Sequence, residues 1–328
     1  MRILTVGGTR FFGRAFVEEA ARRGHEVSVF HRGESEPPDL PDVEHLHGDR
    51  KAGVEILGGR SWDAVLDTCA FVPREVREIA EAIGDRIGHY ALVSSLSVHP
   101  DDLPVGATEH TATHLPPHPD TEVVTDETYG PLKVACEVEA AGAFGGRLLV
   151  IRPGYIVGPH DPTDRFTYWV RRAAAGGEML APGPPDASIQ GIDARDLGNF
   201  VLDRIEAADS DTYGVVGPAE PATMAGVLES ARSAGDADTT FVWADQDFVL
   251  GLGDRYETWF PMWHPHLPGF HAYDAGKATA AGLRPRPFDE TIADTLAWDR
   301  KRGLPPLEAG MTPEKESELL SEWRARAE

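Results

Sequence analysis

The sequence predicts an α/β fold in which a doubly wound parallel sheet is joined to a smaller mixed α/β lobe. Three observations support this prediction. Short apolar runs alternate with segments of helical apolar spacing through the first half of the chain. A glycine-rich turn, VGGTRFFG at residues 6–13, joins the first apolar run to the first helical segment. Beyond residue 155 the alternation loosens, and Pro/Gly-rich loops separate the shorter segments.

The first half contains the apolar runs expected of strands that are buried on both faces. They cover residues 3–6, 25–30, 44–48, 63–67, 89–94 and 147–151. Helices are expected after the glycine turn, from Pro73 onward, and from about Tyr129 to Ala141. Residues 100–128 are rich in Pro, His, Thr and Asp, and they predict a long loop over the carboxyl ends of the strands.

The second half predicts the smaller, substrate-side lobe. A final helix is expected after Thr312-Pro313. The other helices are expected near residues 163–175, 195–207, 223–234 and 287–302. We therefore assign residues 1–154 to one domain and residues 155–328 mainly to a second, with segments near residues 187–218 returning to the sheet of the first.

Composition and charge narrow the function classes. Apolar residues make up 41% of the 328-residue chain, and no apolar run approaches the roughly 20 residues that span a bilayer. The formal charge of −23 and only five lysines oppose nucleic-acid binding, because affinity for polyanions needs clustered cations. No basic-then-apolar leader precedes the first strand, so we expect a cytoplasmic protein without a membrane segment.

The cysteines and histidines give no sign of a metal centre. Cys69 and Cys136 are too few for a disulfide framework and are expected to be small buried residues. No group of Cys and His has the spacing of a zinc site, and the His-Pro-His at 264–266 is expected to lie in a loop. We therefore expect no metal.

Tyr129-Gly-Pro-Leu-Lys133 is the strongest chemical signal. Both side chains share one face of a helix that begins just after the long loop. A phenol needs its anion stabilised before it can exchange protons at neutral pH, and a neighbouring ammonium favours that anion. Ser94-Ser95-Leu96-Ser97 stands at the end of the fifth strand, where a hydroxyl could hold a substrate carbonyl or simply end the strand.

These segments resemble the extended short-chain dehydrogenase/reductases, and specifically the NAD-dependent epimerase/dehydratase group. The GGTR form of the turn is most similar to a subgroup that includes chloroplast stem-loop RNA-binding proteins and reductase-like proteins. The resemblance implies a Rossmann domain that binds the cofactor, and a homodimer built from helices that flank the sheet. It rests on residues 7–13, Ser95, Tyr129-x-x-x-Lys133, RPGYIVGP at 152–159 and GIDARDL at 191–197.

The resemblance also implies individual roles. Tyr129 would be the catalytic acid/base, and Lys133 would favour its anion and bind the nicotinamide ribose. Ser95 would orient the reacting oxygen, because its register fits better than that of the neighbouring serines. Pro153 would flank the nicotinamide ring. The residues expected to contact the cofactor are Gly7, Gly8, Thr9, Arg10, Phe11, Phe12, Gly13, His31, Arg32, Asp49, Arg50, Cys69, Ala70, Tyr129, Lys133 and Pro153.

Two arginines bear on the choice of cofactor. The family places an acid at the end of the second strand to bind the adenosine ribose, but this chain reads Phe30-His31-Arg32-Gly33. Arg10 follows the two close-approach glycines, so its side chain can join Arg32 around a ribose 2′-phosphate. We therefore expect NADP(H) in preference to NAD(H). The alternative is that Arg10 packs over the adenine and Arg32 is solvated, while Asp49 would contact the adenine of either cofactor.

The substrate is expected to be a small molecule. Nucleotide-sugar enzymes of the family carry an arginine where this chain has Ile189, which favours a substrate that is not a nucleotide sugar. Arg165 could bind an anion instead, or pair with Asp161 or Asp164. The aromatic candidates could equally belong to the core. The side chains expected to face the substrate are Phe71, His99, Arg165, Tyr168, Gln190 and Trp263.

The leading hypothesis is an NAD(P)-dependent reductase or dehydrogenase that moves hydride between NADP(H) and a carbonyl or alcohol, with Tyr129 transferring the proton. One alternative is an epimerase or dehydratase that retains its cofactor. A second is an RNA-binding member of the family without redox turnover, which the negative charge opposes. A third is a non-catalytic cofactor sensor, for which the tyrosine would be unnecessary.

Overall fold

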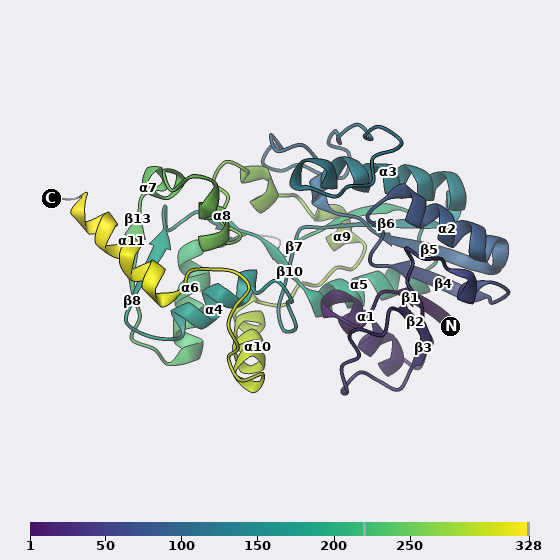
Figure 1. Ribbon diagram of the computed structural model, residues 1–328, viewed down its shortest axis with the longest axis horizontal. Coiled ribbons are helices and arrows are strands. Elements are labelled where there is room, and N and C mark those ends of the chain that lie inside the picture. The colour runs from purple at the N-terminus through teal and green to yellow at the C-terminus, as the bar shows by residue number, and fades with distance from the viewer. Residues whose placement is uncertain (219–220, 327–328) are drawn as a thin grey trace. The chain divides into compact units, whose positions relative to one another are not determined.

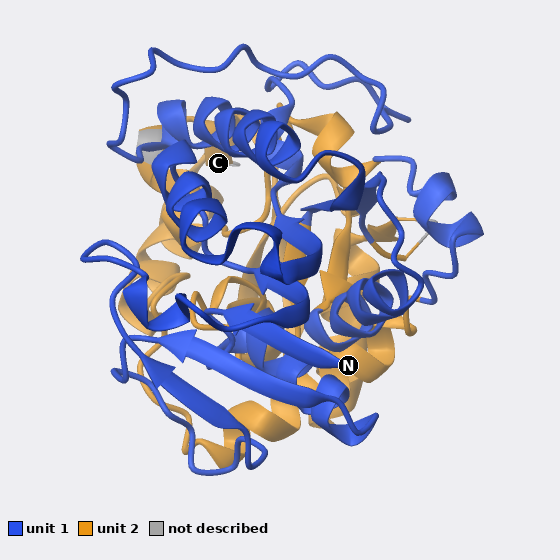
Figure 2. Cartoon of the chain, turned by 90° about the vertical axis from the view of Figure 1, so that its right-hand side faces the viewer, with its two compact units in different colours: residues 1–154, 194–216, 273–284 blue, residues 155–193, 217–272, 285–328 orange. Residues whose placement is uncertain are grey.

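The computed structural model describes residues 1–218 and 221–326, and Figure 1 shows their helices and strands. The chain divides into two compact units, which Figure 2 shows in different colours. Unit 1 consists of residues 1–154, 194–216 and 273–284. Unit 2 consists of residues 155–193, 217–272 and 285–328. Within the described residues, no helix is both long and apolar enough to cross a membrane.

Unit 1 is built on a seven-stranded sheet in the order β11-β6-β5-β4-β1-β2-β3. Every neighbouring pair in this sheet is parallel. The chain runs outward in one direction through β2 and β3 and in the other through β4, β5 and β6, so the order reverses between β1 and β4. The strands are β1 (Arg2–Val6), β2 (Glu26–His31), β3 (Glu44–His47), β4 (Trp62–Asp67), β5 (Ile87–Val93), β6 (Leu148–Pro153) and β11 (Thr212–Val215).

Helices cover both faces of this sheet, which confirms the predicted doubly wound fold. Helices α1 (Phe11–Arg22) and α5 (Ala194–Glu206) pack together on one face. Helices α2 (Pro73–Ile83) and α3 (Asp126–Phe144) pack together on the other (Figure 1). The shorter segments of unit 1 are η1 (Glu55–Leu57), η2 (Gly84–Arg86), η3 (Leu96–Val98), η4 (Gly145–Arg147) and α9 (Gly276–Ala280).

Alternation along the strands explains how one sheet has two buried faces. Leu4 and Val6 of β1 pack in a core with Ile79 of α2 and Phe144 of α3. Thr5 lies between them in the sequence and contributes to the opposite face. Residues on both faces of β1 are buried, so the strand shows a nearly continuous apolar sequence rather than an alternation of apolar and polar residues.

The helix that bears Tyr129 begins earlier than expected. Helix α3 starts at Asp126, not near Tyr129, and ends at Phe144. Thr125 precedes it as the N-cap, because its Oγ1 accepts a hydrogen bond from Thr128 N–H while Thr128 Oγ1 accepts one from Thr125 N–H. This reciprocal pair satisfies two backbone groups of the first turn, so the helix extends back into the segment predicted as loop.

Unit 2 combines helices with three small strand pairs. The pairs are β8 (Glu178–Pro182) with β13 (Thr240–Ala244), β7 (Tyr155–Val157) with β10 (Gly191–Asp193), and β9 (Ser188–Ile189) with β12 (Ala222–Thr223). Its helices are α4 (Arg165–Ala173), α6 (Met224–Gly235), α7 (Gln246–Leu250), α8 (Tyr256–Trp259), α10 (Phe288–Lys301) and α11 (Pro313–Ala325), with η5 (Gly253–Arg255) and η6 (Pro268–His271) between them.

Aromatic side chains form the centre of unit 2. Trp169, Phe260 and Trp263 belong to one apolar cluster, and Trp169 Nε1–H donates to the Pro261 carbonyl at 2.7 Å. Tyr168 and Trp263 are only 2% and 1% exposed. Both were expected to face the substrate; the structure places them in the core, which is the alternative that the sequence left open for the aromatic residues.

Candidate functional site

The glycine turn lies at the carboxyl end of β1, where the strand order reverses. Gly7 and Gly8 have φ values of 88° and 102°, a conformation that side chains disfavour. A Cβ on Gly13 would lie 2.6 Å from Gly8 Cα, so only glycine lets α1 approach the turn this closely. In α/β sheets, ligands bind at this reversal point, with anionic groups at the N-terminus of the following helix.

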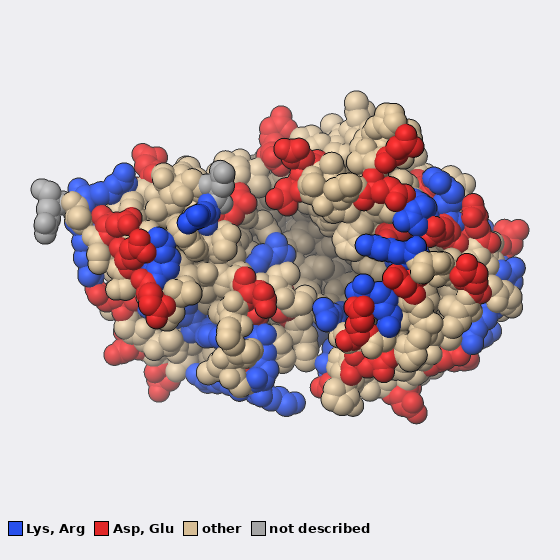
Figure 3. All heavy atoms as spheres, in the orientation of Figure 1, with Lys and Arg blue, Asp and Glu red and all other residues tan. Residues whose placement is uncertain are grey.

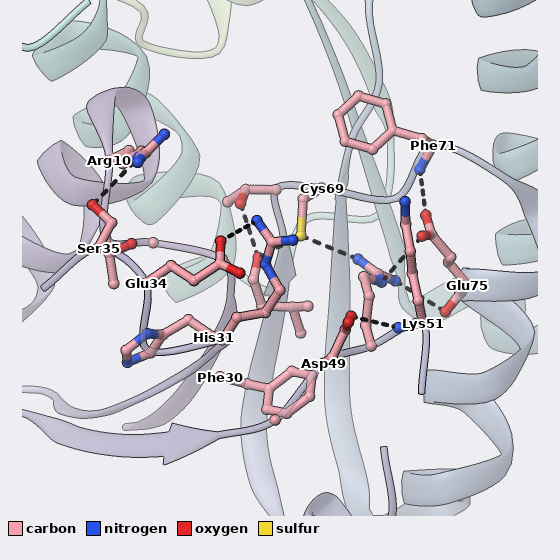
Figure 4. A pocket seen from close by; sticks show the side chains of 18 residues that line it. Arg10, Phe30, His31, Glu34, Ser35, Asp49, Lys51, Cys69, Phe71 and Glu75 are labelled. Carbon is pink, nitrogen blue, oxygen red and sulfur yellow. Dashed lines mark hydrogen bonds and ion pairs between the residues drawn. The ribbon is translucent and has the colours of Figure 1, made fainter. Parts of the chain in front are cut away.

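Arg10 sits at the N-cap of α1 without obstructing this turn. Its backbone is extended, with φ −131° and ψ 150°, and its side chain is directed to Ser35, whose Oγ accepts a hydrogen bond from Nε at 3.0 Å. The two glycines before it make the close approach, and the arginine extends along the pocket wall (Figure 4). A bulky cation is therefore compatible with the turn.

A pocket of about 440 Å³ opens at this edge of the sheet, within the range of small-molecule sites. Figure 4 shows Arg10, Glu34 and Ser35 at one end and Phe71 at the other. Its lining residues are Val6, Gly7, Gly8, Thr9, Arg10, Phe30, His31, Arg32, Glu34, Ser35, Gly48, Asp49, Arg50, Lys51, Thr68, Cys69, Phe71 and Glu75.

Not every expected cofactor residue lines this pocket. Those that do are Gly7, Gly8, Thr9, Arg10, His31, Arg32, Asp49, Arg50 and Cys69. Those expected but outside its lining are Phe11, Phe12, Gly13, Ala70, Tyr129, Lys133 and Pro153. Phe12 and Gly13 are buried in α1, and Pro153 is buried at the end of β6.

Glu34 brings a carboxylate into the pocket that the sequence did not predict. The sequence predicts no carboxylate at the adenosine ribose because β2 ends without an acid. Glu34, in the loop after β2, nevertheless lines the pocket, and its Oε2 lies 2.8 Å from Arg32 Nη2. Arg32 is 59% exposed, so this ion pair is solvated and weak. This end of the pocket therefore offers two arginines, a serine hydroxyl and one carboxylate.

A buried ion pair involves Arg50, one of the residues that line the pocket. Arg50 donates from Nη1 and Nη2 to the two carboxylate oxygens of Asp67, at 2.8 and 2.9 Å. Tyr90 O–H donates to Asp67 Oδ2 at 2.8 Å. Burial raises the pKa of Asp67, but the charge and hydrogen bonds of Arg50 outweigh it and leave that pKa below its ordinary value. Arg50, expected to contact the cofactor, thus holds β4 to the segment after β3.

Sequence reasoning missed Asp67 and Tyr90. The available signal was Asp67 itself, a carboxylate at the end of an apolar strand, since a buried charge requires a partner. Cys69 lies next to this pair, and Arg50 Nη1 is 3.3 Å from its Sγ. Burial, followed by the Asp67 charge, raises the pKa of the Cys69 thiol. Both cysteines were expected to be buried; Cys136 is buried, whereas Cys69 is only partly buried and lines the pocket.

Lys133 is held firmly under α3. Its ammonium is buried and donates to the carbonyls of Ala70 and Val93, both at 2.7 Å. An ammonium has three N–H donors, so one remains for a further partner. These two bonds tie α3 to the carboxyl ends of β4 and β5. Ala70, expected to contact the cofactor, contributes its carbonyl to this lysine.

Phe71 links the pocket to the tyrosine–lysine pair. It lines the pocket, and its ring centroid lies 6.4 Å from that of Tyr129 and 5.7 Å from Lys133 Nζ. Tyr129 is half-buried, on the first turns of α3. Phe71 itself is 43% exposed, which suits a residue that contacts a ligand better than one that belongs to a core.

Ser95 caps the short segment η3. Its Oγ accepts a hydrogen bond from Ser97 N–H and contacts Ser97 Oγ, both at 3.1 Å. A Cβ on Gly130 would lie 2.1 Å from the Ser97 carbonyl, so the start of α3 packs directly on η3. Ser95 and Tyr129 therefore lie on adjoining segments. Ser95 lies two residues beyond the end of β5, and its side chain is half-buried.

The neighbouring Ser94 forms a hydrogen bond with α3. Its Oγ donates to Glu137 Oε1 at 2.5 Å, and Glu137 forms a buried ion pair with Arg152 at 2.6 Å. His99 is 1% exposed, and its Nδ1–H donates to the Ala112 carbonyl at 3.0 Å. His99 was expected to face the substrate; this geometry instead makes it an anchor of the loop that follows η3.

The unit 2 candidates have different surroundings. The Arg165 guanidinium stacks 5.3 Å from the Tyr155 ring centroid, while Asp161 accepts from Thr163 and Asp164 pairs with Arg302. Arg165 was expected either to bind an anion or to pair with Asp161 or Asp164. In the structure it instead packs over the ring of Tyr155. Gln190 is 1% exposed, and its backbone N–H donates to a ring nitrogen of His271 at 3.3 Å.

Known proteins resemble the chain in sequence. Residues 3–216 match the NAD dependent epimerase/dehydratase family. The chloroplast stem-loop binding protein of 41 kDa b from Arabidopsis thaliana is 25% identical over 252 residues, which cover 71% of this chain and 63% of that protein. The match thus spans less than two thirds of this relative's length.

Solved structures share the fold at low sequence identity. The UDP-Glc/GlcNAc 4-epimerase from Campylobacter jejuni matches with a TM-score of 0.69 at 13% identity, over 92% of this chain and 99% of that chain. The UDP-glucuronic acid 4-epimerase from Bacillus cereus, solved in complex with NAD, matches with a TM-score of 0.67 at 13% identity, over 92% and 99%. At such identities the likeness concerns the fold.

Proposed function

The chain belongs to the NAD-dependent epimerase/dehydratase family, and we propose that it is an NAD(P)-dependent oxidoreductase acting on a carbonyl or alcohol of a small substrate. The observation that carries the proposal is the position of Tyr129 and Lys133. They lie beside Phe71, at one end of a pocket that begins at a glycine turn. A site that only binds a dinucleotide needs no such pair.

The glycine turn and α1 fit the pyrophosphate of a dinucleotide. Gly7 and Gly8 leave no side chain between the backbone and a ligand, and the first N–H groups of α1 can donate to phosphate oxygens. Asp49 is exposed on the pocket wall and can accept hydrogen bonds from an adenine amine. The cofactor supplies the hydride chemistry.

Tyr129 would move the proton. Its hydroxyl donates to the substrate oxygen as a carbonyl is reduced, or accepts the proton as an alcohol is oxidised. Lys133, fixed by two backbone carbonyls, supplies a positive charge that favours the phenolate and one N–H for the cofactor ribose. Ser95 would hold the reacting oxygen against the tyrosine.

NADP(H) is our preferred cofactor. Arg10 and Arg32 both line the ribose end of the pocket, and guanidinium groups bind phosphate bidentately. The hydroxyl of Ser35, already bonded to Arg10, would add a neutral donor. Glu34 opposes this preference, because its carboxylate would have to leave Arg32 and turn away from a 2′-phosphate.

Two measurements test the proposal. Calorimetric titrations with NADPH and with NADH, at low and high salt, should show tighter NADPH binding that weakens with salt; no binding of either cofactor would contradict the oxidoreductase assignment. Tyr129→Phe should lower kcat by roughly 10²- to 10⁴-fold, the range of general acid–base catalysis, and leave cofactor affinity within about twofold.

Tyr213→Phe, which removes a phenol hydroxyl outside the pocket, is the control for Tyr129→Phe. Tyr213 O–H donates to Asp209 Oδ2 at 2.7 Å, on the edge strand β11, and Tyr213 does not line the pocket. Tyr213→Phe should retain normal turnover. Normal turnover in Tyr129→Phe would remove the tyrosine from the mechanism.

An epimerase or dehydratase with a retained cofactor is the second candidate. The similarity in fold to two UDP-sugar 4-epimerases favours it. Ile189, buried in β9 where nucleotide-sugar enzymes of the family carry an arginine, disfavours a nucleotide sugar. Measuring NADPH consumption against product formation distinguishes the two candidates. A reductase consumes added NADPH in proportion to product, whereas an epimerase forms product with no net change in cofactor.

RNA binding is the third candidate, suggested by the chloroplast relative. The distribution of charge disfavours it. On the face drawn in Figure 3, Lys and Arg side chains lie beside Asp and Glu, and pairs such as Arg74–Glu78 and Arg77–Glu139 neutralise arginines on α2. Retention of a labelled RNA stem-loop at low salt, with no turnover of cofactor, would favour this candidate instead.

A further inference from the structure

Strands β2 and β3 bring three histidines together at the edge of the sheet. β3 is the last strand of the sheet, and its parallel register places His47 opposite His31 and His45 opposite Val29. Because alternate residues of a strand share a face, His45 and His47 lie on the same side as His31. Glu36, from the loop that follows β2, completes the group.

The four side chains already have the dimensions of a metal site. Their ligand atoms all lie within 4.8 Å of one another. His31 Nε2 is 2.8 Å from His45 Nδ1 and 3.7 Å from Glu36 Oε1, while His47 Nε2 is 2.5 Å from the same oxygen. With zinc–nitrogen bonds of about 2.0–2.1 Å, neighbouring donors of a tetrahedral site are about 3.3 Å apart.

We propose that His31, Glu36, His45 and His47 bind a divalent transition-metal ion, with Zn²⁺ as the best match. Imidazole nitrogen favours zinc over calcium or magnesium, which prefer all-oxygen ligands. Three nitrogens and one carboxylate oxygen complete a tetrahedron. His31 is buried while His47 and Glu36 are 56% and 43% exposed, so an ion can enter from solvent.

The present hydrogen bonds show what an ion would change. His31 Nδ1 accepts from Gly33 N–H at 3.1 Å, so its Nε2–H donates to His45. Coordination through His31 Nε2 displaces that proton and moves a proton to Nδ1, which gives up the Gly33 bond. Metal binding therefore shifts the one ring proton of His31 from Nε2 to Nδ1 without net release, and exchanges the hydrogen bonds to His45 and from Gly33 for bonds to the metal.

The site would also fix a functional loop. Residues 32–35 connect two of the ligands and include Arg32, Glu34 and Ser35, which line the pocket. An ion that holds both His31 and Glu36 would restrict the ends of this loop. No metal was expected because the ligands are not close together along the chain; the loop between β2 and β3 brings His31 and His45 together across 14 residues.

The test uses full-length protein without a histidine tag, stripped of metal with a chelator and dialysed. Competition with a chromophoric chelator should give one equivalent of bound Zn²⁺ with a Kd of about 1 μM or tighter. Co²⁺ should give the visible absorption of a tetrahedral site. Zn²⁺ should also raise the melting temperature, because it binds the folded state.

The decisive variant is His45→Gln with His47→Gln. Zn²⁺ affinity should fall by more than about 100-fold, beyond the roughly 10- to 100-fold typical of losing an outer-shell partner. The control is His110→Gln with His118→Gln, two exposed histidines outside the group, which should bind as the wild type does. Metal-free circular dichroism and melting show whether the decisive variant is folded.

Glu36→Gln is a second variant, because this exposed loop residue is replaceable without disturbing the sheet. It should weaken Zn²⁺ binding and leave metal-free melting unchanged. Equal Zn²⁺ affinity in the wild type and the His45/His47 variant would overturn the proposal. So would loss of binding in His266→Gln alone, because that histidine belongs to a separate group with Glu257 and His264 in unit 2.

Discussion

At the scale of single residues, the end of the pocket at Arg10, Arg32 and Glu34 would set the choice between the two proposed cofactors. Arg10 contacts Ser35 and Arg32 contacts Glu34, so neither guanidinium is committed to the protein core. A 2′-phosphate would gain charge-assisted hydrogen bonds from both arginines, each worth about 1.5–3 kcal/mol. A 2′-hydroxyl would instead donate to the Glu34 carboxylate. One loop therefore holds groups that favour each cofactor.

Substitution of the two arginines and substitution of Glu34 should change cofactor preference in opposite directions. Arg10→Ala with Arg32→Ala should weaken NADPH at least tenfold more than NADH, because only NADPH loses two phosphate contacts. Glu34→Gln should strengthen NADPH severalfold and weaken NADH, because it removes a negative charge beside the phosphate. Calorimetric Kd values for both cofactors check this. Equal losses in the arginine variant would contradict the 2′-phosphate assignment.

The buried Asp67 has a stabilising role that its neighbours define. Asp67→Asn leaves the buried Arg50 with only the more distant Glu75 carboxylate, 4.0 Å from its Nε, as a counter-charge, so we expect the free energy of unfolding to fall by about 3–5 kcal/mol. Tyr90→Phe removes only one hydrogen bond to Asp67 and should cost about 1.5–3 kcal/mol. Urea unfolding at pH 7 measures both. A smaller loss in Asp67→Asn than in Tyr90→Phe would mean that Arg50 finds another partner.

This stabilisation depends on pH in a definite direction. The pKa of Asp67 lies below its ordinary value in the folded state, because the pairing with Arg50 outweighs burial. Its contribution is therefore complete above about pH 4, the ordinary value for an aspartate, and is lost as the pH falls through the depressed folded-state value. The difference between wild type and Asp67→Asn should shrink over that acid range.

At the scale of elements, patterns within one segment were sufficient for most of unit 1. Six of the seven strands of the sheet were predicted to within one or two residues, because a strand buried on both faces is apolar throughout, whereas β11 was foreseen only as part of a segment returning to the sheet. The glycine turn, Ser95 and the Tyr129–Lys133 pair could be singled out as candidates because each is a local motif. The start of α3 was missed because Thr125 and Thr128 form their capping pair inside a segment with loop composition.

Features that depend on distant contacts could not be predicted from the sequence. Glu34 is three residues beyond β2, and only the course of the loop brings it into the pocket. The Asp67–Arg50 pair joins β4 to the segment after β3, and the His31–His45 contact joins two strands. In the last two cases the partners are 17 and 14 residues apart, so no periodicity connects them.

Two glycines of α3 give a matched test of how that helix is positioned. A Cβ at Gly130 would meet the Ser97 carbonyl at 2.1 Å, whereas a Cβ at Gly142 meets nothing within 4 Å. Gly130→Ala should lower stability by about 1–3 kcal/mol through overpacking and shift Tyr129 relative to Ser95, so kcat should fall with it. Gly142→Ala should raise stability by about 0.4–1 kcal/mol at unchanged kcat. Thermal melts and steady-state rates check both, and similar effects at the two positions would contradict close packing on η3.

At the scale of the whole molecule, arginines pair with the abundant carboxylates and join segments distant in sequence. Within unit 2, Arg171 binds Asp299 and Arg172 binds Glu316, both at 2.6 Å. Within unit 1, Arg23 reaches Asp203 at 2.6 Å and connects α1 to α5. These pairs offset part of the formal charge of −23, and lowering the pH removes them gradually as carboxylates are protonated.

Histidines should make unit 2 sensitive to milder acid. Tyr155, His264 and His271 stack together, and burial lowers the pKa of both histidines to about 4. For His264 the nearby His271, His266 and Arg165 add to this effect of burial. Between about pH 6.5 and 4 the unfolded chain binds protons that the folded chain does not, so stability is complete above that window and falls as the pH decreases.

Urea unfolding at pH 7, 5.5 and 4.5 measures this slope, and tryptophan fluorescence reports mainly on unit 2 because six of the seven tryptophans lie there. Each histidine should contribute up to about 1.4 kcal/mol per pH unit. His264→Gln with His271→Gln should flatten the profile whatever its stability at pH 7, whereas His110→Gln with His118→Gln, both exposed, should leave the slope unchanged. Parallel profiles for the wild type and the buried double variant would show that these histidines do not bind fewer protons in the folded state, and would assign the acid sensitivity to the carboxylate pairs instead.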